Sequence, residues 1–194
     1  MNVCVYGASG ISLDEKYITA TEQLGRKIAE RGWDMVFGGG ANGMMGAAAR
    51  GVYEKGGTII GVAPRFFSAD GMLFDNCSQL IRTDTMRERK QIMEDKADAF
   101  IMTPGGIGTF EEFFEILTLK QLGRHTKPIA VFNVAGYFDA MAEMMENAIR
   151  GRFVREEIKN IYGVYENPDE LLDYIETADR TEYCVYDLKD IKPQ

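Results

Sequence analysis

One segment, residues 103–112, constrains the fold of this chain more than any other part of its sequence. It reads Thr-Pro-Gly-Gly-Ile-Gly-Thr-Phe-Glu-Glu, and it joins the apolar run Ala99–Met102 to a helical pattern that continues to Leu122. A buried strand, a glycine loop and a helix in this order are typical of an α/β protein. Glycines let the backbone N–H groups face outward, beside the positive end of the helix dipole. We therefore predict an anion site, most often filled by a phosphate, at residues 105–109.

Two interpretations of this segment stay open. Thr109 and Glu112 have the spacing of a capping box, which begins many helices that have no functional role, and the glycines can form a simple turn. The combination of three glycines, a threonine and the pair Glu111 and Glu112 favours a functional site instead. The segment is not a Walker loop, because no Gly-Lys-Ser/Thr follows, and Glu111 stands where a Gly-x-Gly-x-x-Gly motif needs its last glycine.

The rest of the chain alternates short apolar segments with helical patterns. This alternation predicts an α/β fold in one domain, a Rossmann-like, doubly wound parallel sheet covered by helices on both faces. We expect the domain to span residues 1–176, followed by a polar C-terminal tail, residues 177–194, of undefined structure. The expected strands are residues 2–6, 33–37, 58–63, 80–83, 99–102, 129–133 and 161–165. The expected helices end near residues 31, 55, 96, 122, 150 and 175, with Ser12 capping the first, and residues 64–77 are expected to form a surface loop.

Three glycine-rich segments, residues 7–10, 38–43 and 105–108, follow expected strands and can meet in one pocket at the carboxyl edge of the sheet. Residues 38–43 match the dinucleotide fingerprint Gly-x-Gly-x-x-Gly. The next expected strand ends Gly-Val-Ala-Pro, however, with no acidic residue to hold an adenosine ribose. We therefore favour close packing of Gly43 and Gly46, with one wall of a nucleotide pocket, over NAD binding.

Composition limits the range of functions. The chain has 22 Lys and Arg and 30 Asp and Glu, a net charge of −8, which disfavours nucleic acid as a partner but allows a small anion in a local pocket. Cys4, Cys77 and Cys184 are far apart and match no metal spacing, so we expect a reducing compartment, no disulfide and no metal. Cys4 is expected in the core, and His125 in a solvated turn. No secretion signal or membrane-length apolar run is present, which predicts a cytoplasmic protein without a membrane partner.

A basic pair precedes the glycine loop at residues 103–112. Arg89 and Lys90 lie on an expected helix, where neighbouring residues point about 100° apart, so one can face the pocket while the other faces solvent. The alternative is a solvated helix face, which is the usual role of such a pair. The adjacent strand and phosphate-type loop favour a functional Arg89.

Three stretches of this sequence carry a family resemblance. They read Gly38-Gly39-Gly40-x-x-Gly43-x-Met45-Gly46, Met86-x-x-Arg89-Lys90 and Pro104-Gly105-Gly106-x-Gly108-Thr109-x-Glu111-Glu112. Together they resemble the Lonely Guy family of cytokinin-activating phosphoribohydrolases, often labelled lysine decarboxylases, over residues 3–150. The resemblance implies a homodimer that needs no cofactor. It implies hydrolysis of the N-glycosidic bond of a nucleoside 5′-monophosphate, AMP or an N6-substituted AMP of the cytokinin type.

The resemblance also implies roles for individual residues. Arg89 and Glu112 are the expected catalytic residues. A carboxylate near C1′ stabilises the positive charge that develops on the sugar, or activates water. Arg89 orients substrate or stabilises charge, because a guanidinium stays protonated and is a poor acid. The expected substrate- and phosphate-binding residues are Ser9, Gly39, Gly40, Lys90, Gly105, Gly106, Ile107, Gly108, Thr109 and Glu111.

Two other functions remain as alternatives. A protein of the same fold could carry a nucleotide or a pterin-type cofactor without turning it over. Amino-acid decarboxylation is the weaker alternative, because it needs pyridoxal phosphate on a lysine and the glycine loops contain none.

Overall fold

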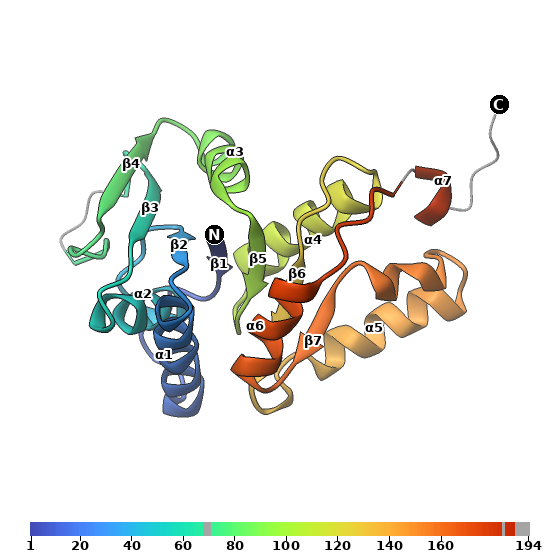
Figure 1. Ribbon diagram of the computed structural model, residues 1–194, viewed down its shortest axis with the longest axis horizontal. Helices are drawn as coiled ribbons and strands as arrows, with labels where there is room; N and C mark the ends of the chain where they lie inside the picture. Colours follow the sequence, from blue (N-terminus) through green and yellow to red (C-terminus); the bar gives the residue numbers. More distant parts are fainter. Residues whose placement is uncertain (68–70, 184, 189–194) are drawn as a thin grey trace.

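The computed structural model describes residues 1–67, 71–183 and 185–188 (Figure 1). Its strands are β1 (Asn2–Tyr6), β2 (Asp34–Phe37), β3 (Ile59–Pro64), β4 (Gln79–Thr83), β5 (Ala99–Met102), β6 (Ile129–Phe132) and β7 (Gly163–Tyr165). They form one seven-stranded sheet in the order β4-β3-β2-β1-β5-β6-β7, and all neighbouring strands are parallel. The predicted parallel sheet is therefore confirmed.

Helices cover both faces of this sheet. They are α1 (Glu15–Glu30), α2 (Gly43–Glu54), α3 (Met86–Lys96), α4 (Ile107–Gln121), α5 (Asp139–Arg150), α6 (Pro168–Thr177) and α7 (Val185–Leu188), with short 3-10 helices η1 (Val134–Gly136) and η2 (Glu156–Asn160). Side chains of α1, α2 and α6 share one buried cluster, and those of α3, α4 and α5 share the other. This two-sided arrangement confirms the predicted doubly wound, single-domain fold.

The sequence of the central strand β1 is apolar at every position from Val3 to Tyr6, rather than alternating apolar and polar residues, because both faces of the strand are buried. Val3 and Val5 pack into the cluster of α1 and α2, whereas Cys4 and Tyr6 pack into the cluster of α3 and α4. All four are buried, because a strand covered on both faces has no side that meets solvent. Cys4 therefore belongs to the core, as predicted.

The strand order places a crevice at the carboxyl ends of β1 and β5. From β1 the chain adds strands toward β4, and after α3 it returns to β5 on the other side of β1. Such a reversal is where open α/β sheets bind ligands. The loops that leave the two strands lie together here, since Ala8 N–H donates to Pro104 O at 3.1 Å and Thr103 Oγ1 donates to Tyr6 O at 2.8 Å.

Several local predictions are wrong. Asp14, not Ser12, caps α1, because the helix begins at Glu15 and the Asp14 carboxylate accepts the Lys16 N–H at 3.0 Å. Aspartate and serine cap equally well, so the spacing of residues 12 and 15 misled the assignment. His125 is half-buried rather than solvated. Its Nε2 donates to Ile116 O at 2.9 Å, and burial lowers its pKa.

The described part of the segment after β3 is a largely exposed loop, as expected, but it also makes contacts that the sequence did not predict. Ala41 N–H donates to Met72 O at 3.0 Å, and Phe74 N–H donates to Gly39 O at 2.9 Å. Phe74 is buried and meets the Phe37 ring edge-on. The described part of residues 64–77 is therefore packed onto the glycine loop that follows β2.

The sequence did not predict the short helices in the connection after β6 and in the C-terminal tail. η1 precedes α5, which begins at Asp139. In the described part of the tail, α7 packs on the domain through buried Leu188, whose carbonyl accepts from Gln121 Nε2 at 3.1 Å. Cys184 lies outside the described residues, and the boundary at residue 176 stays a prediction. No described helix is long and apolar enough to cross a membrane.

Candidate active site

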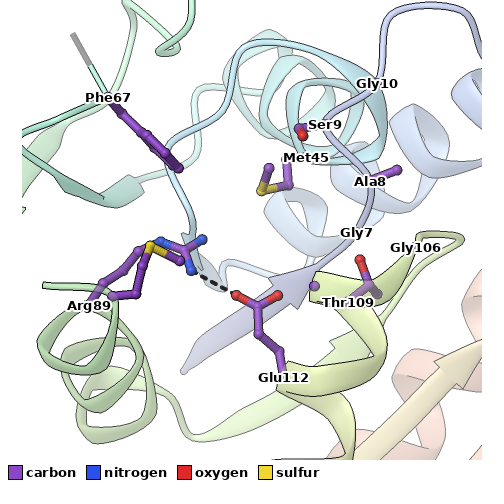
Figure 2. A pocket seen from close by; sticks show the side chains of 12 residues that line it. Gly7, Ala8, Ser9, Gly10, Met45, Phe67, Arg89, Gly106, Thr109 and Glu112 are labelled. Carbon is purple, nitrogen blue, oxygen red and sulfur yellow. Dashed lines mark hydrogen bonds and ion pairs between the residues drawn. The ribbon is translucent and has the colours of Figure 1, made fainter.

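A cavity of about 420 Å³ lies at the crevice between β1 and β5 (Figure 2). Five chain segments form it: the loop after β1, the start of α2, the segment after β3, the start of α3 and the start of α4. Its lining residues are Gly7, Ala8, Ser9, Gly10, Met45, Phe67, Met86, Arg89, Gly106, Gly108, Thr109 and Glu112. The cavity therefore brings together the motifs that the sequence places far apart.

One wall of the cavity is the amino-terminal end of α4. Gly106 is the N-cap in an extended conformation, and no side chain caps the helix. Among the described residues, Phe110 is the first of α4 whose N–H finds a backbone acceptor, Gly106 O at 3.0 Å. The earlier N–H groups are free to bind an anion, and the helix dipole favours one.

The capping-box interpretation of this segment is wrong. Thr109 is the third residue of α4 rather than its cap, and its side chain is buried beside the cavity. Glu112, in the next turn, does not fold back onto the helix start. It points toward α3, where its Oε1 accepts a hydrogen bond from Arg89 Nη1 at 2.8 Å (Figure 2).

This Arg89–Glu112 ion pair is the most buried charge pair on the cavity wall. The side chains are 5% and 11% exposed, so both charges are largely removed from water. Arg89 Nε also donates to Val62 O of β3 at 3.1 Å, which fixes the plane of the guanidinium. A Cβ on Gly38 would lie 1.8 Å from Arg89 Nη2, so glycine is required where the guanidinium crosses the backbone. The other oxygen of Glu112, Oε2, has no hydrogen-bond partner among the described residues.

Burial controls the charge state of Glu112. Desolvation raises its pKa above the ordinary value of 4.5, and the attraction of Arg89 opposes that rise. The carboxylate is thus kept near a cation but has lost most of its water. A group of this kind is ready to stabilise a positive charge on a bound molecule.

The second basic residue of α3 has a different set of contacts. Lys90 forms ion pairs with Glu111 and with Glu115, the latter at 2.6 Å. Its side chain is 15% exposed and does not line the cavity. The adjacent carboxylates Glu111 and Glu112 each pair with a cation of α3, Lys90 and Arg89 respectively. This pairing explains how acidic residues can stand beside the predicted anion site.

The other expected site residues divide by position. Ser9, Gly106, Gly108 and Thr109 line the same cavity as the ion pair. Gly40 lines a neighbouring cavity of about 450 Å³, and Gly105 lines a third of about 340 Å³ on the other side of the loop. Three more line none of these cavities: Gly39, Glu111 and Ile107, whose side chain is 89% exposed.

Sequence reasoning missed several side chains of the cavity. Met45 stands in a recognised motif but had no assigned role, and Met86 begins α3. Phe67 comes from the segment after β3, where no periodic pattern points to a site. Phe67 and Met45 also line the neighbouring cavity, together with Met72 and Leu73. Their apolar surfaces form a wall suited to a flat heteroaromatic ring.

Metal ligands are not grouped in this site. Among the described residues, no cluster of three or more His, Cys, Asp or Glu side chains could hold a metal ion. The two described cysteines, Cys4 and Cys77, are free thiols away from the cavity.

The fold and the cavity define a Rossmann-like protein with a glycine loop and an uncapped helix start at its switch point. Residues 45–175 match the family model described as "Possible lysine decarboxylase". The chain is 35% identical over 174 residues to cytokinin riboside 5′-monophosphate phosphoribohydrolase LOG2 of Arabidopsis thaliana, which covers 90% of this chain and 82% of the plant protein. It is 36% identical over 159 residues to the phosphoribohydrolase LOG of Oryza sativa subsp. japonica, over 82% of this chain and 66% of that protein. The chain belongs to the Lonely Guy (LOG) family, as its motifs predict.

Solved structures agree on the fold. The X-ray structure of the protein TM1055 has a TM-score of 0.70 and 25% identity, and the match covers 90% of this chain and 98% of that one. The molybdenum cofactor carrier protein of Chlamydomonas reinhardtii also has a TM-score of 0.70, with 22% identity over 91% and 96% of the two chains. At that identity the carrier shares the fold alone.

Proposed function

We propose that this protein hydrolyses the N-glycosidic bond of a nucleoside 5′-monophosphate, releasing the free base and ribose 5-phosphate. The substrate class is AMP or an N6-substituted AMP of the cytokinin type. The observation that carries the proposal is the buried Arg89–Glu112 pair, one helical turn beyond the anion-binding start of α4. The names of the relatives support the same reaction.

We assign a proposed role to each part of the cavity. The 5′-phosphate binds at the N–H groups of residues 106–109, with the Thr109 hydroxyl beside them. C1′ then lies near Glu112, whose carboxylate stabilises the developing positive charge or takes a proton from water. The water oxygen bonds to C1′ as the C–N bond breaks, and a proton ends on the base. Arg89 fixes Glu112 and supplies positive charge, and the base lies against Met45 and Phe67.

The test of this function compares AMP, adenosine and ATP at equal concentration, with free adenine measured by chromatography. AMP should be cleaved and adenosine should not, because the phosphate holds the reacting bond in place. ATP should be a poor substrate, since the loop accommodates one phosphate. Adenosine cleavage as fast as AMP cleavage would show that the loop is only a turn.

The same assay separates the proposed enzyme from a carrier. A nucleotide or pterin carrier binds its ligand and releases no base, whereas the proposed hydrolase releases one base per nucleotide consumed. Binding of AMP without adenine release over hours would favour the carrier. N6-isopentenyl-AMP tested beside AMP would show whether the apolar wall prefers a substituted base.

Gly108→Ala should lower AMP cleavage without unfolding the protein. A Cβ at Gly108 meets no atom within 4 Å and Gly108 lines the cavity, so the new methyl group enters the space where the phosphate approaches the backbone. Alanine also favours a helix over glycine by about 1 kcal/mol, so the melting temperature should be equal or higher. The measurements are kcat/KM for AMP and thermal unfolding; unchanged kcat/KM would contradict a phosphate site here.

The pH profile of kcat/KM should have an acidic limb above pH 4.5. Glu112 must be ionised to act, and burial raises its pKa from 4.5, so activity falls as pH drops through this raised pKa. Glu94 provides the control, because burial raises its pKa to about 7 and it lies outside the cavity. Glu94→Gln should leave the acidic limb in place. A limb that moves with Glu94→Gln would contradict the assignment to Glu112.

The homodimer and the compartment remain proposals that rest on the family resemblance and the sequence. Ile107 is 89% exposed and Met86 is 40% exposed, both beside the cavity, which gives apolar surface for a second copy to cover. Sedimentation equilibrium at micromolar concentration should give twice the mass of one chain. The proposed compartment is the reducing cytoplasm.

A further inference from the structure

Tyr137, which lies outside the family motifs, contacts the loop at residues 105–109. This loop is the proposed phosphate site and is called the phosphate loop below. The Tyr137 hydroxyl donates a hydrogen bond to Gly105 O at 2.6 Å. Tyr137 follows η1, in the connection between β6 and α5, and it also lines the cavity of about 340 Å³ on the far side of the loop. The bond thus joins the phosphate loop to a second, independent part of the fold.

Tyr137 is itself held firmly. The preceding turn is fixed by Asn133, whose Oδ1 accepts from Phe138 N–H at 2.7 Å and whose Nδ2 donates to Asp139 Oδ1 at 2.8 Å. The Tyr137 ring meets Phe138 edge-on at 4.9 Å between centroids, and Tyr17 of α1 edge-on at 5.5 Å. Tyr137 is 38% exposed, and these ring contacts together with the bond to Gly105 O restrict the direction of its hydroxyl.

The hydrogen bond from Tyr137 to Gly105 O sets the direction of the Gly106 N–H, because the two groups belong to one planar peptide. In a planar trans peptide the C=O and the next N–H point in opposite directions. No cis peptide occurs in the described chain, so a Gly105 carbonyl held toward Tyr137 turns the Gly106 N–H away from it. Gly105 and Gly106 have no side chains to restrict their backbone, and glycine pairs sample many conformations. Backbone bonds at Pro104 O and Gly106 O hold the loop on either side of this peptide, and the Tyr137 hydroxyl contacts the Gly105 carbonyl itself.

We propose that Tyr137 is a positioning residue that orients the phosphate loop, acting through the Gly105–Gly106 peptide rather than by touching the substrate. The inference rests on the proposed function in one respect, the identity of the anion as a 5′-phosphate. Its effect is specific to the phosphate: the Arg89–Glu112 pair has no contact with Tyr137 among the described residues. Loss of the hydroxyl should therefore weaken phosphate binding and leave the bond-breaking residues in place.

Tyr137→Phe tests the proposal, because it removes the hydroxyl and keeps both ring contacts. The first measurement is the Kd of inorganic phosphate and of ribose 5-phosphate by calorimetry. We expect both to weaken by about threefold to tenfold, the net effect of one hydrogen bond. KM for AMP should rise by a similar factor, with a smaller change in kcat. The melting temperature should stay within a few degrees of wild type.

Tyr17→Phe is the matched control. It removes a hydroxyl from the neighbouring ring without a bond to the loop, and it should leave phosphate affinity unchanged. Unchanged phosphate affinity and KM in Tyr137→Phe would overturn the proposal, as would an equal loss with Tyr17→Phe or a fall in kcat alone. Phosphate binding is measured without turnover. A wild-type protein that binds phosphate but does not cleave AMP would refute the proposed reaction and still leave this inference to be decided by the Tyr137→Phe affinity.

Discussion

Glu112→Gln is expected to lower kcat for base release from AMP by about 10²–10⁴-fold, the usual loss for a positioned acid–base group. Glutamine keeps the size of the side chain and can still accept the hydrogen bond from Arg89, so the pair loses its charge but not its packing. The negative charge that faces C1′ is lost entirely. The measurement is single-turnover adenine release at saturating AMP, with circular dichroism to verify the fold.

Glu115→Gln is the matched control for this prediction. Glu115 lies on the same helix, one turn further along, and it pairs with Lys90 outside the cavity. Its substitution removes the same charge from α4, so it should retain activity close to wild type. If Glu112→Gln turned over at the wild-type rate, Glu112 would be a structural partner of Arg89 and the catalytic carboxylate would lie elsewhere.

Arg89→Ala should lose about 10²-fold or more in kcat/KM, the typical loss of a fixed electrostatic contact in a buried site. The substitution leaves Glu112 buried without its cation, which raises the carboxyl pKa further and shifts the acidic limb to higher pH. Arg89→Lys should not restore activity, because lysine cannot bond Glu112 and Val62 O in one plane. The measurement is kcat/KM for AMP across pH.

Lys90→Ala should cost much less activity, because Lys90 does not line the cavity. Its partners Glu111 and Glu115 are 53% and 38% exposed, so losing these pairs should cost at most about 1 kcal/mol of stability. The two variants remove adjacent cations from one helix, so their difference reports which side chain faces the substrate. Equal losses for both would mean that they act only by joining α3 to α4. Full activity of Arg89→Ala would place the substrate in another cavity.

The arrangement of the sheet followed from the sequence because its central strands are apolar on both faces and three glycine-rich segments follow strands. These are local patterns, and they predict that the loops after β1, β2 and β5 can meet at the carboxyl edge of the sheet, whereas the crevice between β1 and β5 follows from the strand order. Glu112 and Arg89 could be named in the same way, from motifs. Their pairing could not, since it joins side chains 23 residues apart on two helices whose relative orientation is set by packing.

Other features depend on contacts that no pattern encodes. Phe67 enters the cavity because the chain after β3 folds back onto the glycine loop, and its sequence has no period that predicts this path. Tyr137 reaches Gly105 because an irregular turn precedes α5, including Ala135 at a φ of 50°. Ser12 and Asp14 are both good caps, and only the position of the first helical turn decides between them.

The cavity draws its two walls from separate stretches of chain. The ion pair and the glycine loop belong to α3 and α4 and the segment before α4, whereas Met45 and Phe67 on the apolar wall belong to the first half of the protein. Under the proposed function, selection of the base and cleavage of the bond would be encoded in different segments. Substitutions in the apolar wall can exchange one base for another while the cleaving groups stay untouched. A family built this way can diverge in substrate while keeping one reaction.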